Sequence, residues 1–203
     1  MAKLTLTDIS DLRAYERERE DFRRSVIAHK KKRRVALGPV VTLLFESRDT
    51  IRFQIQEMAR AEKIMSDEGI QVELDVYNPL IPEPGSLAAT LFIELTSDAA
   101  LREWLPKLVG IETMLELRVG PDAHPVRCVV DPEHEKQLTR DDITAAVHYI
   151  HFELDPAEVA LATTGPITLA SVHPAYPFVA DLAPETRQEL SDDLNGTTST
   201  DVT

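Results

Sequence analysis

The sequence has almost no cysteine. Cys128 is the single cysteine among 203 residues. One cysteine cannot form an internal disulfide bond, and it cannot supply the roughly three or four thiolates of a cysteine-rich zinc or iron–sulfur site. Glu-x-x-His pairs of the kind that bind two irons in ferritin-like bundles are also missing. We therefore expect no metal site and no cofactor, and the expected compartment is the reducing cytoplasm.

Long apolar runs and common catalytic motifs are absent as well. No segment approaches the roughly 20 apolar residues that span a bilayer, and the residues MAKLTLTDISDL do not resemble a signal peptide. We expect a cytoplasmic protein without membrane association. The motifs GxGxxG, GxxxxGK[ST], HExxH, CxxC and GxSxG are all lacking. No reaction follows from the sequence, and whether the protein is an enzyme stays open.

Positive charge is scarce outside one segment. The chain has 35 acidic and 22 basic residues and a net charge of −13. Residues 13–34 carry ten basic and four acidic side chains, a local charge of +6, which leaves −19 for the rest. The acidic remainder repels phosphate, and no aromatic residue interrupts the run from His29 to Arg34 for base stacking.

This run has two interpretations. It can be the solvated end of a helix, where cations complement the helix dipole. It can also dock onto an acidic protein surface, whereas nucleic acid is not expected as a partner. The candidate docking residues are Lys30, Lys31, Lys32, Arg33 and Arg34.

Hydrophobic periodicity predicts an α+β fold. Apolar residues at mostly three- and four-residue offsets predict a long basic helix over residues 8–34, with Thr7 as its N-cap. Residues 40–45 are apolar on both faces, which is typical of a central strand. Further helices are expected over 49–65, 67–78, 97–109, 156–162 and 184–194, and further strands over 87–95, 112–119, 126–130, 145–154, 167–172 and 176–181.

Short turns between these strands favour antiparallel pairing. We therefore predict a mostly antiparallel sheet with the long N-terminal helix and other helices packed on it. Residues 1–194 are expected to form a single domain, followed by a disordered polar tail over residues 195–203.

The densest polar segment follows the predicted central strand. Gln54, Glu57 and Arg60 recur at intervals of three, so one helical face presents an amide, a carboxylate and a guanidinium. This face can belong to an anion or ligand pocket, but a capped helix with intrahelical ion pairs explains the same residues. The candidate pocket residues are Arg48, Asp49, Gln54, Glu57, Arg60, Glu94 and His148, with Tyr149 as a further option.

The histidines give little support for a metal site. His148 and His151 are three apart in a predicted strand, and this offset places them on opposite faces. His148 shares an apolar face, where a hydrogen-bonded core histidine is common. His173 precedes a proline at a strand junction, which favours a turn-stabilising role.

Several segments together resemble a known family. They are KKKRRVALGPVVTLLFESRDTIRFQIQEMARAEKI, YNPLIPEPGSLAATLFIEL, VHYIHFEL and VHPAYPFVADLAPETRQELSDDL. The pattern from Thr5 to Leu194 resembles an uncharacterised bacterial family of unknown function, DUF3501. The resemblance supplies no activity. It implies a context in redox or peroxide metabolism, because similar proteins tend to be encoded beside rubrerythrin-like proteins and iron–sulfur oxidoreductases.

Two hypotheses follow. In the first, the protein is a non-catalytic accessory or adaptor that docks onto a rubrerythrin-like protein or an iron–sulfur oxidoreductase. In the second, it is a small-ligand or metal-dependent enzyme with a polar pocket around Arg48, Glu57 and Glu94. The sequence does not fix the oligomeric state, and a homo-oligomer stays open.

Overall fold

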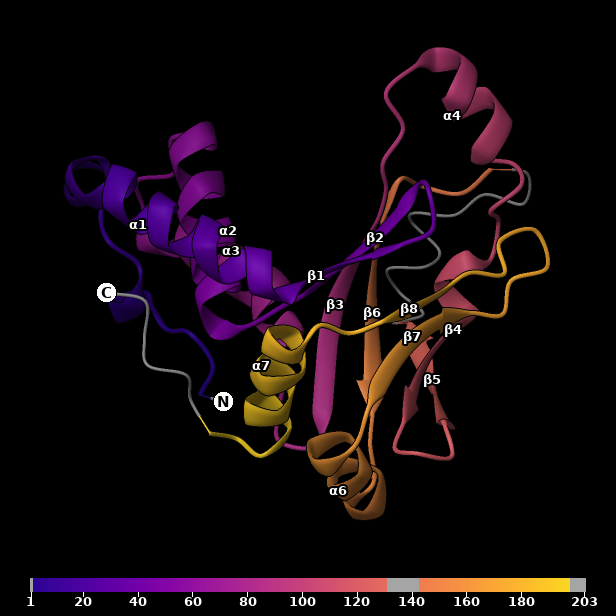
Figure 1. Cartoon of the computed structure of the whole chain (residues 1–203). Helices are drawn as coiled ribbons and strands as arrows, with labels where there is room; N and C mark the ends of the chain where they lie inside the picture. The colour runs from indigo at the N-terminus through magenta and orange to yellow at the C-terminus, as the bar shows by residue number, and fades with distance from the viewer. Residues whose placement is uncertain (1, 131–142, 198–203) are drawn as a thin grey trace.

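The structure is a computed structural model that describes residues 2–130 and 143–197. It combines helices with one curved antiparallel sheet, so the predicted α+β class is confirmed (Figure 1). The helices and 3-10 turns are η1 (Leu6–Asp8), α1 (Leu12–Arg33), α2 (Arg48–Glu62), α3 (Asp67–Tyr77), η2 (Asn78–Leu80), α4 (Asp98–Trp104), η3 (Ile111–Thr113), α6 (Pro156–Thr164) and α7 (Pro184–Leu194). The strands are β1 (Arg34–Leu37), β2 (Val41–Phe45), β3 (Ser86–Ile93), β4 (Leu115–Val119), β5 (His124–Val130), β6 (Val147–Glu153), β7 (Ile167–Ser171) and β8 (Val179–Asp181).

The sheet has the strand order β1-β2-β3-β6-β5-β4-β7-β8, and every pair is antiparallel. All five residues of β2 are buried, and β2 is paired on both sides, with Leu43 opposite Val35 in β1 and Leu91 in β3. The prediction of a central strand is therefore confirmed. The residues of β2 are buried on both faces of the sheet, because each face of the strand is covered by other parts of the chain.

The sheet curls until its two edge strands, β1 and β8, lie beside each other. Tyr176 bridges this seam, since its hydroxyl donates to the carbonyl of Leu37 at 2.7 Å and accepts from the amides of Val40 and Val41 at 3.0 and 3.1 Å. Gly38 has φ +68°, and a Cβ there would lie 2.6 Å from the ring of Phe178. Glycine is therefore required where the turn passes under the aromatic pair, and the sheet is a nearly closed barrel.

The interior of the barrel is filled with apolar side chains. Alternate residues of the strands point inward, as the period of two requires, and Leu190 and Leu194 of α7 join the same cluster. Inward residues such as Leu43, Leu91 and Leu117 are completely buried. This interior is a packed core.

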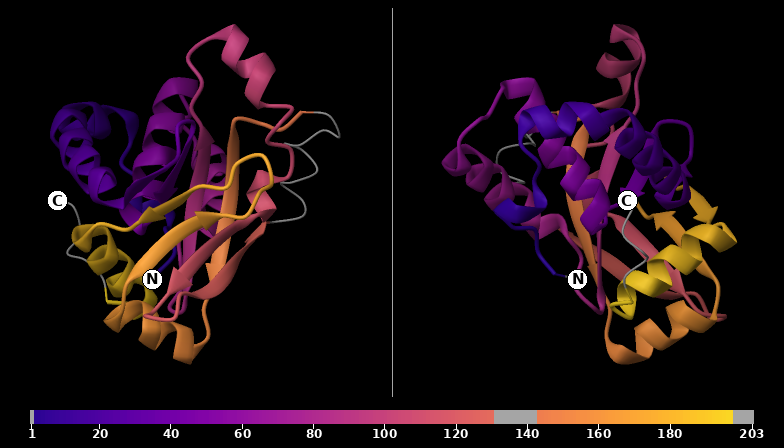
Figure 2. Two further views of the ribbon diagram at one scale, coloured as in Figure 1. Left: turned by 45° about the vertical axis from the view of Figure 1, so that its right-hand side comes forward. Right: turned by 90° about the vertical axis from the view of Figure 1, so that its left-hand side faces the viewer.

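A helical layer covers the outside of part of the barrel. In Figure 1, α1, α2 and α3 gather on one side of the sheet, and α4 projects beyond one end; Figure 2 shows the same arrangement from two further sides. Ile51 and Ile55 of α2 pack with Leu74 and Leu80 against the outer face, where Tyr149 joins them. Helix α1 packs on α2 through Tyr15, Phe22 and Val26, which contact Phe53, and so forms an outer layer. No helix among the described residues is long and apolar enough to cross a membrane.

Several predicted boundaries were wrong for local reasons. The long helix begins at Leu12, because the carboxylate of Asp11 accepts the amides of Arg13 and Ala14 and caps it, while Thr7 lies in the separate turn η1. The helix expected over 97–109 ends at Trp104, just before Pro106.

Two predicted strands are also shorter than expected. The strand expected from residue 112 begins at Leu115 after η3, and the strand expected from residue 176 is reduced to Val179–Asp181. Residues 198–203 of the predicted tail lie outside the described residues.

Candidate functional site

A buried ion cluster joins the end of α1 to α7. Arg33 is 1% exposed, and its guanidinium donates to the carbonyls of Phe45 and Glu46 at 3.0 and 2.9 Å. It also pairs with Glu189 at 3.2 Å and with Asp193, one helical turn further along α7. Burial raises the pKa of Asp193 to about 6, although Arg33 opposes that shift. We call His29, Lys32, Arg33, Glu189 and Asp193 the clamp, because they tie the C-terminal end of α1 to α7.

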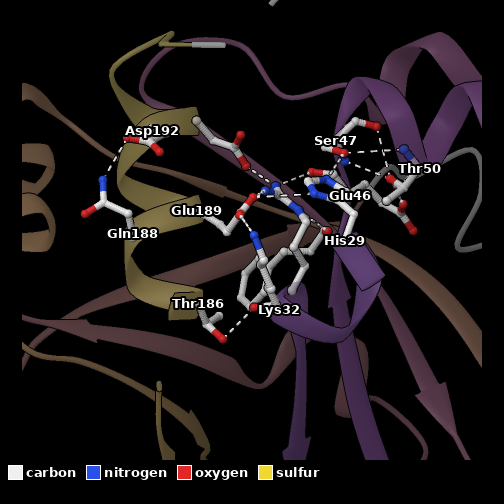
Figure 3. Close-up of polar contacts among 12 residues, drawn as sticks. His29, Lys32, Glu46, Ser47, Thr50, Thr186, Gln188, Glu189 and Asp192 are labelled. Atoms are coloured by element: carbon white, nitrogen blue, oxygen red, sulfur yellow. Dashed lines mark hydrogen bonds and ion pairs between the residues drawn. The ribbon is translucent and has the colours of Figure 1, made fainter. Parts of the chain in front are cut away.

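His29 also connects the clamp to the start of α2 through Ser47 (Figure 3). Its Nδ1 lies 3.6 Å from Oε2 of Glu189, and its Nε2 lies 2.9 Å from Oγ of Ser47. Burial lowers the pKa of His29, and Arg33 lowers it further. The contacts from Ser47 to His29 and from His29 to Glu189 follow the same order as those of the Ser–His–acid triad of a hydrolase. Ser47, however, is 6% exposed and its Oγ accepts the amide of Thr50 as the helix cap, so this geometry serves structure.

The start of α2 holds the side chain of Glu46 in place. The hydroxyl of Thr50 accepts the amide of Ser47 at 2.8 Å and donates to Oε2 of Glu46 at 2.5 Å. From the neighbouring strand, the hydroxyl of Thr90 donates to Oε1 of Glu46 at 2.5 Å. The amide of Glu46 also donates to the carbonyl of Ala88 at 2.8 Å. Backbone and side chain are therefore both fixed.

Glu46 is a buried carboxylate that forms no ion pair within the described chain; the residue is 6% exposed. Burying a charge is costly unless it is paired and hydrogen-bonded. The two threonine hydroxyls satisfy only part of its capacity, because a carboxylate has about four acceptor positions.

Glu46 faces a cavity of about 270 Å³ between α2, η2 and the outer face of β2, β3 and β6. Polar side chains line it from five helices and strands and from the connection between β2 and α2. The lining consists of Lys30, Leu44, Glu46, Thr50, Ile51, Gln54, Tyr77, Leu80, Thr90, Phe92, Val147 and Tyr149. A concave cavity that combines apolar walls with a few convergent polar groups is typical of a small-molecule site.

Lys30 is the cation of this cavity. Its ammonium group lies 5.2 Å from the centre of the Phe53 ring, and burial lowers its pKa, while the nearby charge of Glu46 opposes that shift. Burial also raises the pKa of Tyr149, and the neighbouring Tyr77 and Glu46 raise it further, so this phenol stays protonated. The cavity thus contains an acid, a base and hydrogen-bonding phenols in a partly desolvated setting.

The predicted pocket residues do not converge as a set. Arg48 pairs with Asp8 at 2.5 Å, Arg60 pairs with Glu16 at 2.5 Å, and Glu94 pairs with Arg34 at 2.9 Å. The hydroxyl of Thr42 also donates to Glu94. Each of these predicted residues is engaged by a different part of the chain.

Glu57 turns toward α1. It receives two hydrogen bonds of 2.8 Å from Arg19 and one of 2.7 Å from the hydroxyl of Tyr15. The hydrogen bonds from Arg19 lower the pKa of Glu57, while burial and the bond to Glu57 raise that of Tyr15. This contact fastens α1 to α2.

The remaining predicted residues divide between the cavity and the core. Gln54 lines the cavity. Asp49 is buried in the first turn of α2. His148 is 2% exposed, with Nε2 2.8 Å from the hydroxyl of Thr144, as expected for a hydrogen-bonded core histidine.

The five predicted docking cations have different environments. Lys31 is exposed, Lys32 contacts Glu189 at 3.3 Å, and Arg34 is partly exposed against Glu94. Lys30 lines the cavity, and Arg33 is inaccessible inside the clamp. The docking assignment is therefore wrong for Arg33, because two carboxylates of α7 and two carbonyls consume its donors.

Sequence patterns did not identify Glu46, Thr90 or Tyr77 as site residues. One signal was available, since Thr90 is a polar residue within an apolar strand and Glu46 directly follows another. The register pairs Phe45 with Ala89 and Leu44 with Thr90, which puts Glu46 diagonally opposite Thr90. That register becomes visible only once the two strands are paired.

The sole cysteine lies in the core. Cys128 donates its S–H to the carbonyl of Glu112 at 3.1 Å, and burial raises its pKa to about 11. Such a thiol is unreactive, because the thiolate is the nucleophilic form. No group of three or more His, Cys, Asp or Glu side chains within residues 2–130 and 143–197 could hold a metal ion.

The fold and cavity define an α+β protein with a nearly closed antiparallel barrel, an outer helical layer and a polar cavity between them. The chain belongs to the family DUF3501, described as a protein of unknown function, which matches residues 3–194. A similar crystal structure is that of a novel protein of unknown function from Burkholderia pseudomallei K96243. That protein is 42% identical, has a TM-score of 0.87, and the match covers 95% of this chain and 100% of that one. No curated protein matches the sequence.

Proposed function

We propose that this protein binds a small polar metabolite in the cavity between α2 and the outer face of β2, β3 and β6. The observation that carries the proposal is Glu46, a buried carboxylate held by Thr50 and Thr90 at the wall of the cavity, with no ion pair among the described residues. Its desolvation cost is offset if a bound molecule supplies the missing partner.

A comparison with the barrel interior supports a ligand site in the cavity outside the sheet. Small-molecule sites need space together with a few polar groups that fix the ligand's orientation. The described interior is a packed apolar core. The cavity outside the sheet has both features, and Lys30 and Gln54 bring polar groups from two helices.

The test compares two valine variants on neighbouring strands. Val147 lines the cavity and is 36% exposed, whereas Val129 of β5 is 51% exposed and is not part of the lining. Val147→Trp should obstruct the cavity, and Val129→Trp provides a matched control for a surface tryptophan. A library of polar metabolites is screened by thermal shift, and each hit is confirmed by calorimetry on both variants.

We expect a ligand whose affinity falls at least tenfold in Val147→Trp and stays unchanged in Val129→Trp. If no metabolite in the library binds, or if the hits bind Val147→Trp as tightly as the unaltered protein, the proposal is wrong.

A second proposal is the accessory role beside a rubrerythrin-like protein or an iron–sulfur oxidoreductase in the cytoplasm. Its support is that Lys31 and Lys32 are exposed on α1 while the only thiol, Cys128, is buried, so the chain would dock without exchanging thiols. Titration of the purified chain against a purified rubrerythrin-like protein at low salt tests this role. Binding that weakens with salt and in Lys31→Glu supports the role, and no binding at low salt contradicts it.

A further inference from the structure

Two residues of opposite charge line the cavity without forming an ion pair with each other. Glu46 and Lys30 both line it, and no described carboxylate lies within ion-pair distance of Lys30. The positive group lies against an aromatic ring, and the negative group is held by two hydroxyls. The cavity therefore offers two separate charged ends to one ligand.

The acidic end is preorganised. Thr50 and Thr90 each donate to a different oxygen of Glu46, and the main chain of Glu46 is fixed by Arg33 and Ala88. Each carboxylate oxygen keeps one further acceptor position. A group with several N–H donors and a positive charge suits these positions, and an ammonium group has three such donors.

The basic end is formed by Lys30, a lining residue whose compact ammonium group is carried on a flexible stem and lies against the Phe53 ring. A carboxylate is the complementary ligand group. The rest of the lining includes aromatic and aliphatic side chains, with Phe92, Leu44 and Leu80 among them. These apolar walls suit an apolar side chain of the ligand.

The size of the cavity limits the ligand. A volume of about 270 Å³ corresponds to about nine water molecules at about 30 Å³ each. A free amino acid of medium size fits within this space, whereas a nucleotide or a folded peptide segment does not.

Building on the ligand-binding function proposed above, we infer that the ligand is a zwitterion of the α-amino acid class. Its ammonium group meets Glu46, its carboxylate meets Lys30, and its side chain lies against the apolar wall. A zwitterion pairs the buried charge of Glu46 and the half-buried charge of Lys30 at once. A ligand with a single charge would leave the other protein charge desolvated and unpaired.

The experiment measures binding by calorimetry for three forms of the same compound. Leucine and phenylalanine have both charges, their N-acetyl derivatives lack the ammonium group, and their methyl esters lack the carboxylate. We expect the free amino acid to bind at least tenfold more tightly than either derivative. Equal binding of all three forms would overturn the inference.

Two variants assign the charged ends. Glu46→Gln should weaken binding of the free amino acid at least tenfold and leave the N-acetyl derivative unchanged, because that derivative has no ammonium group to lose. Lys30→Met should weaken the free amino acid similarly and leave the methyl ester unchanged. Lys31→Met, which removes the exposed neighbouring cation, is the control and should change nothing. A reversed pattern, or free amino acid binding that neither variant weakens, would also overturn the inference.

The two proposals fail in different ways. If a metabolite without zwitterionic character binds and Val147→Trp abolishes its binding, the cavity function stands and the amino acid assignment is wrong. If neither the library nor the amino acids bind, both proposals are wrong.

Discussion

The clamp and the cavity are two buried polar regions that meet at Glu46, and they treat charge in opposite ways. In the clamp, Arg33 is matched by Glu189 and Asp193 from within the chain. In the cavity, Glu46 and Lys30 form no such pairs within the described residues. The backbone carbonyl of Glu46 belongs to the first region and its carboxylate belongs to the second. Internally matched charge holds the fold together, and unmatched buried charge marks the place where a ligand is expected.

The largest effect is expected from breaking the clamp. Arg33→Met keeps most of the side-chain volume but leaves Glu189 and Asp193 without their common cation, and two carbonyls lose their donor. Removal of one partner from a buried ion pair costs about 3–5 kcal/mol. Urea unfolding should show this loss in the free energy of unfolding.

Lys31→Met is the control for Arg33→Met, because Lys31 is an exposed cation in the same run. It should change the free energy of unfolding by less than about 0.5 kcal/mol. A loss below about 1 kcal/mol in Arg33→Met would contradict the assignment of the clamp as a buried ion cluster that holds α1 to α7.

The second effect is on the pH dependence of the free energy of unfolding. Asp193 and His29 of the clamp have pKa values shifted in opposite directions, so they change this free energy with pH in opposite senses. Asp193 has a folded pKa of about 6, above its usual 3.8, so the folded state binds more protons and stability falls as pH rises through this window. His29 has a lowered pKa, so the unfolded state binds more protons below about 6.5 and stability falls as pH drops through that range. The two contributions oppose each other between about pH 4 and 6.5.

Single variants separate these contributions. Asp193→Asn should make the protein lose more stability than the unaltered chain when the pH falls from 7 to 5. His29→Gln should make it lose less. The contribution of Asp193 is at most about 3 kcal/mol for its shift of about two units. Urea unfolding at pH 5, 6 and 7 measures the slopes, and slopes that change in the same direction would refute the opposition.

The third effect compares the two buried glutamates directly. Glu46→Gln should change the free energy of unfolding by less than about 1 kcal/mol, because its amide can accept from Thr50 and donate to Thr90, and an unpaired buried charge is removed. Glu189→Gln should cost at least about 2 kcal/mol, because the amide keeps one acceptor oxygen and so loses the hydrogen bond from either Arg33 or Lys32, together with the charge that matches Arg33. Equal losses in both variants, measured by urea unfolding, would remove the distinction between clamp and cavity.

The sequence predicted features that depend on neighbours along the chain. The continuous apolar character of residues 41–45 identified a central strand, and it is paired on both sides. Gln56 is a buried glutamine beside the core face of α2, and its amide pairs with both the N–H and the carbonyl of Ser10, as a buried amide requires. Pro106 could also have predicted that the helix expected over residues 97–109 ends early, as α4 does at Trp104.

Features that depend on distant partners were not predictable in this way. Arg33 is buried where α7 packs on the end of α1, and its partners Glu189 and Asp193 lie 156 and 160 residues further along the chain. No local sequence pattern indicates a contact over such a separation. Glu57 faces α1 because two helices pack together, although its spacing from Gln54 suggested a shared pocket. The side chains that line the cavity come from separate helices and strands, and only the folded register brings them together.

The smallest effect is expected at a residue that the sequence placed in the pocket and the structure places at the surface. The side chains of Arg60 and Glu16 are 39% and 52% exposed and form an ion pair between α2 and α1. Exposed ion pairs contribute about 0–1 kcal/mol, since water and salt screen them. Arg60→Met should therefore lower the free energy of unfolding by less than about 1 kcal/mol, and the loss should shrink further in high salt. It should also leave ligand affinity in calorimetry unchanged, because Arg60 is not part of the cavity lining. A tenfold loss of ligand affinity in this variant would mean that the ligand contacts the outer face of α2, and would move the site away from Glu46.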